Sequence, residues 1–225
     1  MRTIAILPIK SLGAAKQRLS AQLGSGSRQA LAQAMFSDVL ASLRHVEGVD
    51  EIVVVTANDV AESAARGNGV RLLYDGEEAG QSAAAMIGLR HALAAGYDRA
   101  LLVPGDTPLL DPGEVDALLA RGGPVTIVPD RHGTGTNCLL LEPPEAIEPS
   151  FGPGSQDRHV AAARAAGIEP VVDSVPSLML DIDTPDDLAE LSGRLEGCHG
   201  HAPLTRGALR QLDRSRVRPP LAASA

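Results

Sequence analysis

The sequence predicts an α/β protein of three layers, in which helices cover both faces of a mixed, mostly parallel sheet with an antiparallel hairpin. Short apolar runs of strand length alternate along the chain with helix-length segments, the order typical of parallel sheets. Hydrophobic residues make up 44% of the 225 residues, but aromatic residues make up only 2%. The core must therefore consist mainly of Ala, Val, Leu and Ile, which suits a parallel sheet under helices of small residues.

Seven runs predict strands, because each is short, apolar and bounded by turn residues. They are residues 3–9, 51–56, 70–74, 99–103, 125–128, 138–141 and 169–173. Only nine residues separate the fifth run from the sixth, too few for a crossover helix. We therefore expect these two strands to pair antiparallel.

Helices are expected over six other segments. They are residues 27–45, 59–66, 81–95, 112–120, 156–166 and the stretch that begins at 185. The first carries Leu31, Met35 and Val39 at four-residue steps, an apolar stripe that would face the sheet. Pro112 and Pro185 stand at the first positions of two others, where the missing N–H of proline has no intrahelical partner to lose.

The composition narrows the classes of function. A net charge of −8 argues against general binding to nucleic acid or to an anionic membrane surface. We find no secretory signal peptide and no apolar run near the roughly 20 residues that span a bilayer. Two cysteines give no disulfide framework, so the sequence predicts a cytoplasmic protein.

A single domain is expected over residues 1–196, followed by a basic tail over residues 197–225. The tail holds five arginines and one aspartate, a net charge of +4 against −12 for the rest of the chain. It lacks a sustained apolar stripe, so we expect a mobile extension.

A single carboxylate, Asp106, follows the fourth predicted strand in the stretch L-L-V-P-G-D-T-P-L-L, residues 101–110. In an open α/β sheet, ligands bind in the crevice at the carboxyl ends of the strands. Our hypothesis is that Asp106 holds a divalent metal on a nucleoside triphosphate. Further along the chain, Asp181 and Asp183 share one face of an extended segment, because side chains two residues apart point the same way.

Cations and small residues follow the first strand, where Lys10, Lys16 and Arg18 flank the run S-L-G-A-A. This loop suits a polyphosphate, because a small-residue backbone allows close approach and the cations offset the phosphate charge. A solvated basic loop is the alternative. The turn Gly80-Gln81-Ser82 begins a helix and offers free N–H donors and an amide for a base or ribose, although an ordinary helix cap would look the same.

Two later turns are rich in hydrogen-bond donors. One is the hairpin loop over residues 129–137, which contains Thr136 and Asn137 and could equally be a plain hairpin. The other runs from Gly152 to Ser155, just before a helix N-terminus, and is a candidate oxyanion cradle.

Together these features indicate nucleotidyl transfer, in which an acceptor attacks the α-phosphorus of a nucleoside triphosphate and pyrophosphate leaves. Positioning and charge neutralisation supply most of the catalysis in such reactions. Lys16 and Arg18 would balance the triphosphate, and Asp106 and Asp183 would hold one or two Mg²⁺ ions. One acid in a turn is weak evidence for this reaction, and the prediction depends on finding the cations and both acids together in this order.

Five motifs then carry a resemblance to a known family, namely P-I-K-S-L-G-A-A-K-Q-R-L, G-D-T-P-L-L, G-T-G-T-N, S-F-G-P-G-S and L-D-I-D-T-P-D-D-L. Over about residues 1–191 the chain resembles the guanylyltransferases of deazaflavin (coenzyme F-420) biosynthesis. The resemblance implies a Rossmann-like nucleotidyltransferase fold related to GT-A. It also implies an enzyme that joins GTP to phosphoenolpyruvate or 2-phospho-L-lactate, with Mg²⁺. The Ala, Gly and Arg bias of the chain suggests a high-GC bacterium and so favours phosphoenolpyruvate.

Carried onto this chain, the resemblance implies that the acceptor binds at Asn137, Gly152 and Ser155, with Thr136 adjacent. Asp106 and Asp183 would be the metal ligands, and Lys16 would be catalytic beside them. The residues that face GTP would be Lys10, Lys16, Arg18, Gly80, Gln81 and Ser82. An activated diphosphate product would suit direct hand-off to the next transferase of the pathway, and a homodimer is a further expectation.

Three alternative functions predict different sequence features. A guanylyltransferase of the molybdenum cofactor predicts a glycine-rich first loop, from which P-I-K-S-L-G-A-A-K departs. A module that binds GTP without turnover would be favoured by the loss of Asp106 or Asp183, and both are present. A dinucleotide-binding oxidoreductase predicts the G-x-G-x-x-G fingerprint, which the first turn lacks.

Overall fold

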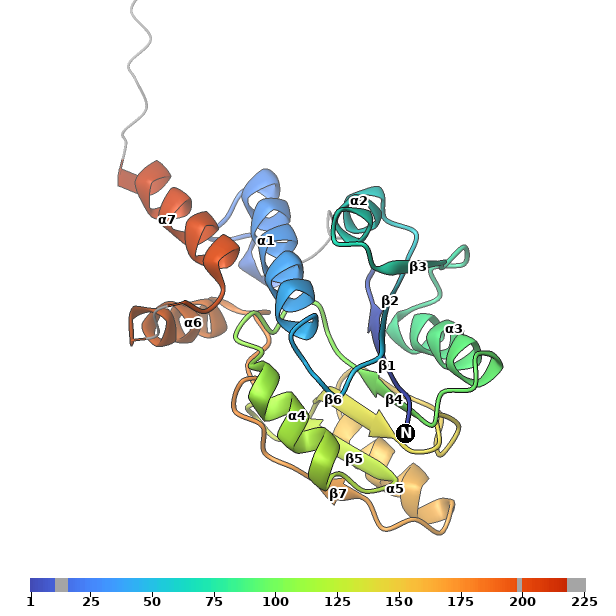
Figure 1. Ribbon diagram of the computed structural model, residues 1–225. Coiled ribbons are helices and arrows are strands. Elements are labelled where there is room, and N and C mark those ends of the chain that lie inside the picture. Colours follow the sequence, from blue (N-terminus) through green and yellow to red (C-terminus); the bar gives the residue numbers. More distant parts are fainter. Residues whose placement is uncertain (11–15, 198–199, 218–225) are drawn as a thin grey trace, which may run out of the picture.

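The computed structural model describes residues 1–10, 16–197 and 200–217, with side chains up to residue 214 (Figure 1). Its centre is a seven-stranded sheet in the order β3-β2-β1-β4-β6-β5-β7. The strands are β1 (Thr3–Pro8), β2 (Glu51–Thr56), β3 (Arg71–Tyr74), β4 (Arg99–Leu102), β5 (Val125–Pro129), β6 (Thr136–Leu141) and β7 (Val171–Val172). In this part of the chain β6 runs antiparallel to β4 and β5, and the other neighbours pair parallel. The predicted mixed sheet and its hairpin are therefore confirmed.

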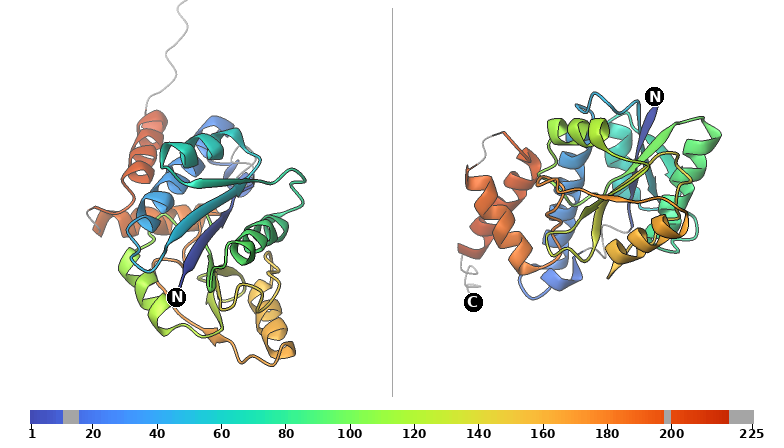
Figure 2. Two further views of the ribbon diagram at one scale, coloured as in Figure 1. Left: turned by 45° about the vertical axis from the view of Figure 1, so that its right-hand side comes forward. Right: turned by 90° about the horizontal axis from the view of Figure 1, so that it is seen from below.

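Helices cover both faces of the sheet, as predicted (Figure 2). The described helices are α1 (Ser25–Leu43), α2 (Asp59–Gly67), α3 (Gln81–Ala94), α4 (Pro112–Arg121), α5 (Ser155–Ala165), α6 (Pro185–Gly197) and α7 (Pro203–Val217), with a short 3-10 helix η1 (Gln17–Leu19). Apolar side chains of α1, α2 and α4 pack on one face of the sheet. Those of α3 and α5 pack on the other. Along the described residues, no helix is both long and apolar enough to cross a bilayer.

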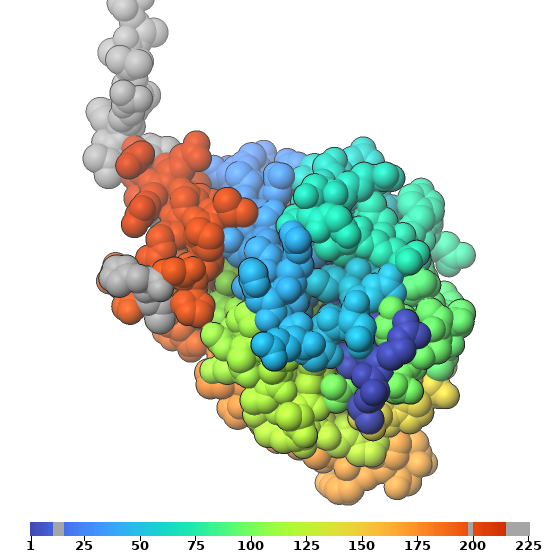
Figure 3. Space-filling view, viewed as in Figure 1, coloured from blue at the N-terminus to red at the C-terminus, as the bar shows by residue number. Residues whose placement is uncertain are grey.

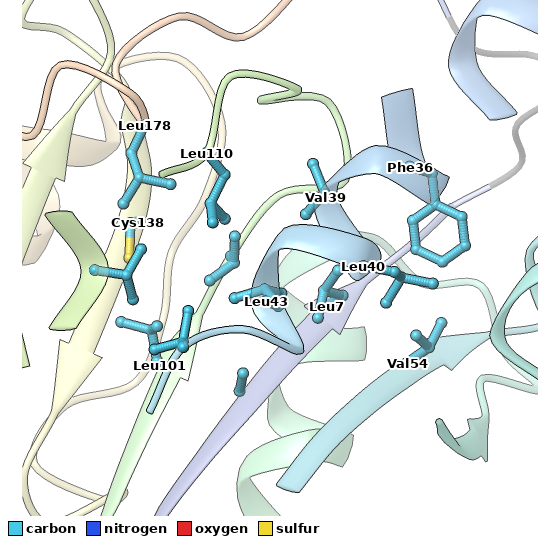
Figure 4. Packing of buried hydrophobic residues seen from close by; sticks show 14 of the residues in the cluster. Leu7, Phe36, Val39, Leu40, Leu43, Val54, Leu101, Leu110, Cys138 and Leu178 are labelled. Carbon is cyan, nitrogen blue, oxygen red and sulfur yellow. The ribbon is translucent and has the colours of Figure 1, made fainter. Parts of the chain in front are cut away.

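The strands alternate their side chains between the two core layers. On β1, Ala5 and Leu7 join the layer under α1, and Ile4 and Ile6 join the layer under α3. Figure 4 shows the first layer, where Phe36 and Leu40 of α1 lie over Leu7 and Val54. Because these strands are buried on both faces, they read as continuous apolar runs, which is why the sequence locates them well.

This topology gathers the polar turns at one edge of the sheet. The carboxyl ends of β1, β4 and β5 meet there, and the antiparallel β6 begins at the same edge. The turn after β4 also approaches β1 closely, since a Cβ on Gly105 would lie 2.5 Å from Cδ1 of Ile9. A side chain at this position would therefore require the Ile9 side chain to move, and Asp106 follows the glycine directly.

The end of the chain differs from the mobile extension that we expected. Pro203–Val217 forms the helix α7, and its apolar residues Ala208, Leu209 and Leu212 pack in a third cluster with α1 and α6. Figure 3 shows α7, in red, lying against α1, in blue. The apolar stripe of α7 is short and lies among arginines, so its sequence pattern is a weak sign of a packed helix. Its packing partner α1 lies about 170 residues earlier in the chain, so the contact could not be read from the local sequence. Residues 198–199 and 218–225 of the expected tail lie outside the described part.

The carboxylate of Asp38 on α1 secures the start of α7. It accepts hydrogen bonds from the backbone N–H groups of Leu204, at 3.2 Å, and Thr205, at 2.7 Å. Asp38 and Thr205 are both buried. A cap supplied by a distant helix leaves no local signal in the sequence of α7 itself.

We expect Asp38→Ala to lower the free energy of unfolding by about 1–2 kcal/mol, because two N–H groups at the start of α7, one of them in a buried hydrogen bond, lose their acceptor. Urea denaturation at pH 7 measures this difference. Asp213→Ala, an exposed carboxylate on α7, is the matched control and should change stability by less than about 0.5 kcal/mol. Equal effects of the two substitutions would contradict the docked position of α7.

Candidate functional site

A pocket of about 390 Å³ opens at the sheet edge where the polar turns meet. Its lining residues come from six separate segments of the chain: Arg18, Gln81, Pro104, Asp106, Asp130, His132, Thr134, Gly135, Thr136, Asn137, Phe151, Gly152, Pro153, Ser155, Asp181 and Asp183. A larger hollow of about 690 Å³ lies elsewhere, beside Arg44 and Arg71. None of the predicted site residues lines that hollow, so the chemistry points to the smaller pocket.

Three carboxylates meet at the floor of this pocket. Asp106, Asp181 and Asp183 each offer an oxygen, and the three oxygens lie within 4.8 Å of one another. Asp181 and Asp183 alternate with Leu180 and Ile182, which are fully buried in the third cluster and so turn both acids toward the pocket. The sequence predicted this shared face but assigned only Asp106 and Asp183 to a metal. The alternation was the signal for Asp181.

Lys16 lies against two of these acids. Its Nζ donates to Oδ1 of Asp183 at 2.8 Å and forms a short ion pair with Oδ2 of Asp106. Burial would lower the pKa of Lys16, but the charges of Asp106 and Asp183 outweigh it and raise the pKa above its usual value. Lys16 is therefore a permanent cation at the centre of the carboxylate cluster. The loop residues 11–15 before it lie outside the described part.

The cluster carries more negative charge than one lysine offsets. Burial, followed by the charge of Asp106, raises the pKa of Asp181 to about 6. This rise is the expected response of a carboxylate held near other carboxylates away from water. Three carboxylate oxygens with excess negative charge form a donor set that suits a hard divalent cation such as Mg²⁺.

A capping contact joins the acids to the β5–β6 hairpin. Oδ2 of Asp187, in the first turn of α6, accepts from the backbone N–H groups of Asp183 and Thr184. Its other oxygen lies 2.6 Å from Nη2 of Arg131 in the hairpin loop. The position of the Asp183 backbone is thus tied to the loop that forms the opposite wall of the pocket.

That wall includes the segment before α5, and Arg158 holds it in shape. The Arg158 guanidinium donates to the carbonyl oxygens of Ser150, Phe151, Gly152 and Pro153. Among the described residues, the N–H groups of Gly152 and Gly154 donate to no protein oxygen. Both glycines have positive φ, 111° and 70°, which lets the backbone form such a concave cradle.

Asn137 lies in the pocket wall, but its side chain is already engaged. Nδ2 donates to the carbonyl of Leu178 at 2.9 Å and to Oδ1 of Asp181 at 3.1 Å. Both partners are acceptors, so the orientation of the amide is fixed and its two hydrogens are used. The side chain of Asn137 therefore positions Asp181 and offers no free N–H to an acceptor.

The residues predicted to face a nucleotide divide into two groups. Arg18 and Gln81 line the pocket. Lys10 does not line it but lies beside Gly80, where a Cβ would be 3.7 Å from its Nζ. Oγ of Ser82 accepts from the backbone N–H of Phe151 at 2.9 Å, so Ser82 links the start of α3 to the cradle before α5.

Several lining residues were outside the predicted set, notably Asp130, His132, Thr134 and Phe151. The first three belong to the hairpin loop over residues 129–137, and Phe151 directly precedes the Gly152–Ser155 turn. The sequence of a turn does not show which of its side chains face inward. The pocket brings together the predicted Arg18, Gln81, Asp106, Asn137, Gly152, Ser155 and Asp183.

This arrangement places the cation Arg18, three acids and the Gly152–Ser155 turn around one pocket, as a nucleotidyltransferase requires. The chain matches the family described as "Guanylyl transferase CofC like" over residues 3–220. The chain belongs to this family. The match extends beyond the motifs, which reached about residue 191, and so includes the described part of α7.

Named relatives in the family differ in their acceptor. A phosphoenolpyruvate guanylyltransferase of Conexibacter woesei is 48% identical over 219 residues, which is 96% of this chain and 98% of that protein. A 2-phospho-L-lactate guanylyltransferase of Methanothermobacter thermautotrophicus is 34% identical, covering 92% of this chain and 91% of its own length. A 3-phospho-D-glycerate guanylyltransferase of Colwellia psychrerythraea is 35% identical, covering 85% and 92%.

Solved structures agree on the fold. A protein of Desulfovibrio desulfuricans G20 described as a nucleotide-diphospho-sugar transferase superposes with a TM-score of 0.75. The match covers 95% of this chain and 96% of that one, at 18% identity. The predicted nucleotidyltransferase fold is therefore confirmed.

Proposed function

We propose that the protein transfers the guanylyl group of GTP to phosphoenolpyruvate, forming enolpyruvoyl-2-diphospho-5'-guanosine and pyrophosphate. The observation that carries this proposal is the pocket itself, which is lined by the Asp106-Asp181-Asp183 cluster and also by Gly152, whose N–H donates to no protein oxygen among the described residues. One side suits a metal-bound triphosphate and the other an anionic acceptor. The identity of the acceptor rests on the relative that shares 48% of its residues with this chain.

In this reaction an oxygen of the acceptor phosphate forms a bond to the α-phosphorus of GTP. The bond from that phosphorus to the bridging oxygen breaks, and pyrophosphate leaves with the electron pair. Because the attacking phosphate is already anionic, no general base is needed. The protein must bring two anions together, so charge neutralisation is its main task.

The three acids would hold Mg²⁺, which when bound neutralises the triphosphate and orients it. Lys16 and Arg18 would contact the triphosphate, with Lys10 supporting the turn at Gly80. Gln81 would read the guanine or the ribose. Gly152 and Ser155 would bind the oxyanions of the acceptor, while Asn137 and Ser82 hold neighbouring segments in place.

The test uses purified protein with GTP, Mg²⁺ and one acid at a time, namely phosphoenolpyruvate, 2-phospho-L-lactate or 3-phospho-D-glycerate. We expect pyrophosphate release with phosphoenolpyruvate and a product of the mass of the guanylylated acid. Release with another acid and none with phosphoenolpyruvate would reassign the acceptor. No release with any of the three would contradict the proposed reaction.

The product is an activated diphosphate, so a transferase that displaces GMP from it must act next. We infer a place in deazaflavin coenzyme biosynthesis, in the cytoplasm, with direct hand-off to that transferase. A homodimer is a further prediction. The family resemblance supports each of these proposals, and size-exclusion chromatography with light scattering measures the oligomeric state.

A further inference from the structure

A buried histidine joins the two walls of the acceptor side of the pocket. His159 lies on α5 and has no exposed surface. Its Nε2 is 2.8 Å from the backbone nitrogen of Ser150, in the segment before the cradle. Its Nδ1 is 2.9 Å from Oγ1 of Thr136, the first residue of β6. The ring therefore connects the β5–β6 hairpin to the cradle.

These two contacts determine the protonation of the ring. A backbone N–H only donates, so Nε2 must carry the free lone pair. In a neutral imidazole the proton is then on Nδ1, which donates to Oγ1 of Thr136. Burial, and secondarily the charge of Arg158, lower the pKa of His159 to about 4, so the ring is neutral near pH 7.

The direction of this hydrogen bond leaves Thr136 with a proton to give. Its hydroxyl oxygen accepts from His159, and its own hydrogen is engaged by no other side chain in the described part of the chain. Thr136 lines the pocket. Its neighbour Asn137 has no side-chain N–H left, because both are used on Leu178 and Asp181.

We propose that the Thr136 hydroxyl donates a hydrogen bond to a carboxylate or phosphate oxygen of the acceptor, and that His159 is the positioning residue that aims it. The inference rests on the proposed function, because the ligand is the phospho-acid of that reaction. It assigns the donor role to Thr136, one residue before the position that the family resemblance indicated. His159 acts through Thr136 and through Ser150 and does not touch the acceptor.

The first experiment compares Thr136→Val with Thr136→Ser. Valine keeps the shape of the side chain and removes the hydroxyl, whereas serine keeps the hydroxyl. Hydrogen bonds to charged groups have a net value that corresponds to about 10- to 100-fold in binding. We therefore expect Thr136→Val to raise KM for phosphoenolpyruvate about 10- to 100-fold, with KM for GTP changed less than about twofold. Thr136→Ser should recover most of the loss.

The second experiment tests the role of His159 with His159→Gln and the double variant. If His159 acts through Thr136, then His159→Gln should raise KM for phosphoenolpyruvate in the wild-type background and add little in Thr136→Val. A merely structural role would give effects that multiply and would lower kcat as well. Nitrogen-15 NMR of the imidazole gives a readout independent of turnover. We expect the neutral, Nδ1-protonated form at pH 7, assigned by its absence in His159→Gln.

The outcomes separate this inference from the proposed function. An unchanged KM for phosphoenolpyruvate in Thr136→Val, with normal wild-type turnover, would overturn the role of Thr136 alone. A protonated or Nε2–H imidazole would overturn the tautomer argument. No turnover by the wild-type protein with any of the three acids would overturn the proposed function, and this inference with it.

Discussion

Asp106→Asn is expected to reduce kcat/KM by about 10³-fold, or about 4 kcal/mol of transition-state stabilisation. Asp106 lies at the centre of the site, where it contacts Lys16 and shares a 4.8 Å cluster with Asp181 and Asp183. An amide at this position donates as well as accepts and carries no charge. The variant would therefore bind a divalent cation more weakly and hold Lys16 less firmly.

The same substitution should leave the fold intact. The Asp106 side chain is 28% exposed, and removing its charge relieves repulsion with Asp181, whose pKa it helps to raise. We expect Tm without metal to change by no more than about 4 °C, the shift that corresponds to roughly 1 kcal/mol for a domain of this size. The rise in Tm that Mg²⁺ produces in the wild type should shrink, because ligand binding stabilises only the form that binds.

Glu145→Gln is the matched control for Asp106→Asn. It makes the same change of charge at an exposed carboxylate that does not line the pocket. Kinetics and Mg²⁺ titrations followed by thermal unfolding should match the wild type. If Asp106→Asn retained near-normal turnover, the acid would have no part in the chemistry.

Much of the fold was predictable because its signals are local. Strands buried on both faces give apolar runs, and the nine-residue separation of β5 and β6 implied an antiparallel pair. The insertion of β6 between β4 and β5 was not predictable, because strand order depends on contacts between distant segments. The docking of α7 was missed for the same reason, since its cap is Asp38 of α1.

The site divides in a similar way. Asp181 and Asp183 were visible as an alternation with apolar neighbours, because burying Leu180 and Ile182 exposes the acids. The engagement of Asn137 was not visible, since its partners Leu178 and Asp181 lie more than 40 residues away. A sequence shows which residues could donate, whereas the structure shows which donors are already in use.

Lys16→Met is expected to change turnover and metal binding in opposite directions. Without the ammonium group, the negative charge that develops on the triphosphate loses a buried counter-charge, so kcat/KM should fall about 10²-fold or more. The rise in Tm that Mg²⁺ produces should occur at lower concentrations, because in the wild type Lys16 competes with a cation for Asp106 and Asp183. Less Mg²⁺ should be needed to reach half of the maximal rise in Tm.

This opposite response distinguishes the roles of Lys16 and Asp106, which activity alone would not separate. Both variants lose turnover, but Asp106→Asn should weaken the Mg²⁺ response and Lys16→Met should sharpen it. Lys10→Met is the matched control, since Lys10 lies beside Gly80 and makes no ion pair with the acids among the described contacts. It should affect KM for GTP while leaving the effect of Mg²⁺ on Tm unchanged.

In the presence of a chelator, Lys16→Met should also unfold at a lower temperature than the wild type, because three carboxylates within 4.8 Å then lack their nearest cation. A weaker Mg²⁺ response in Lys16→Met would show that the lysine supports the cation site instead of competing for it.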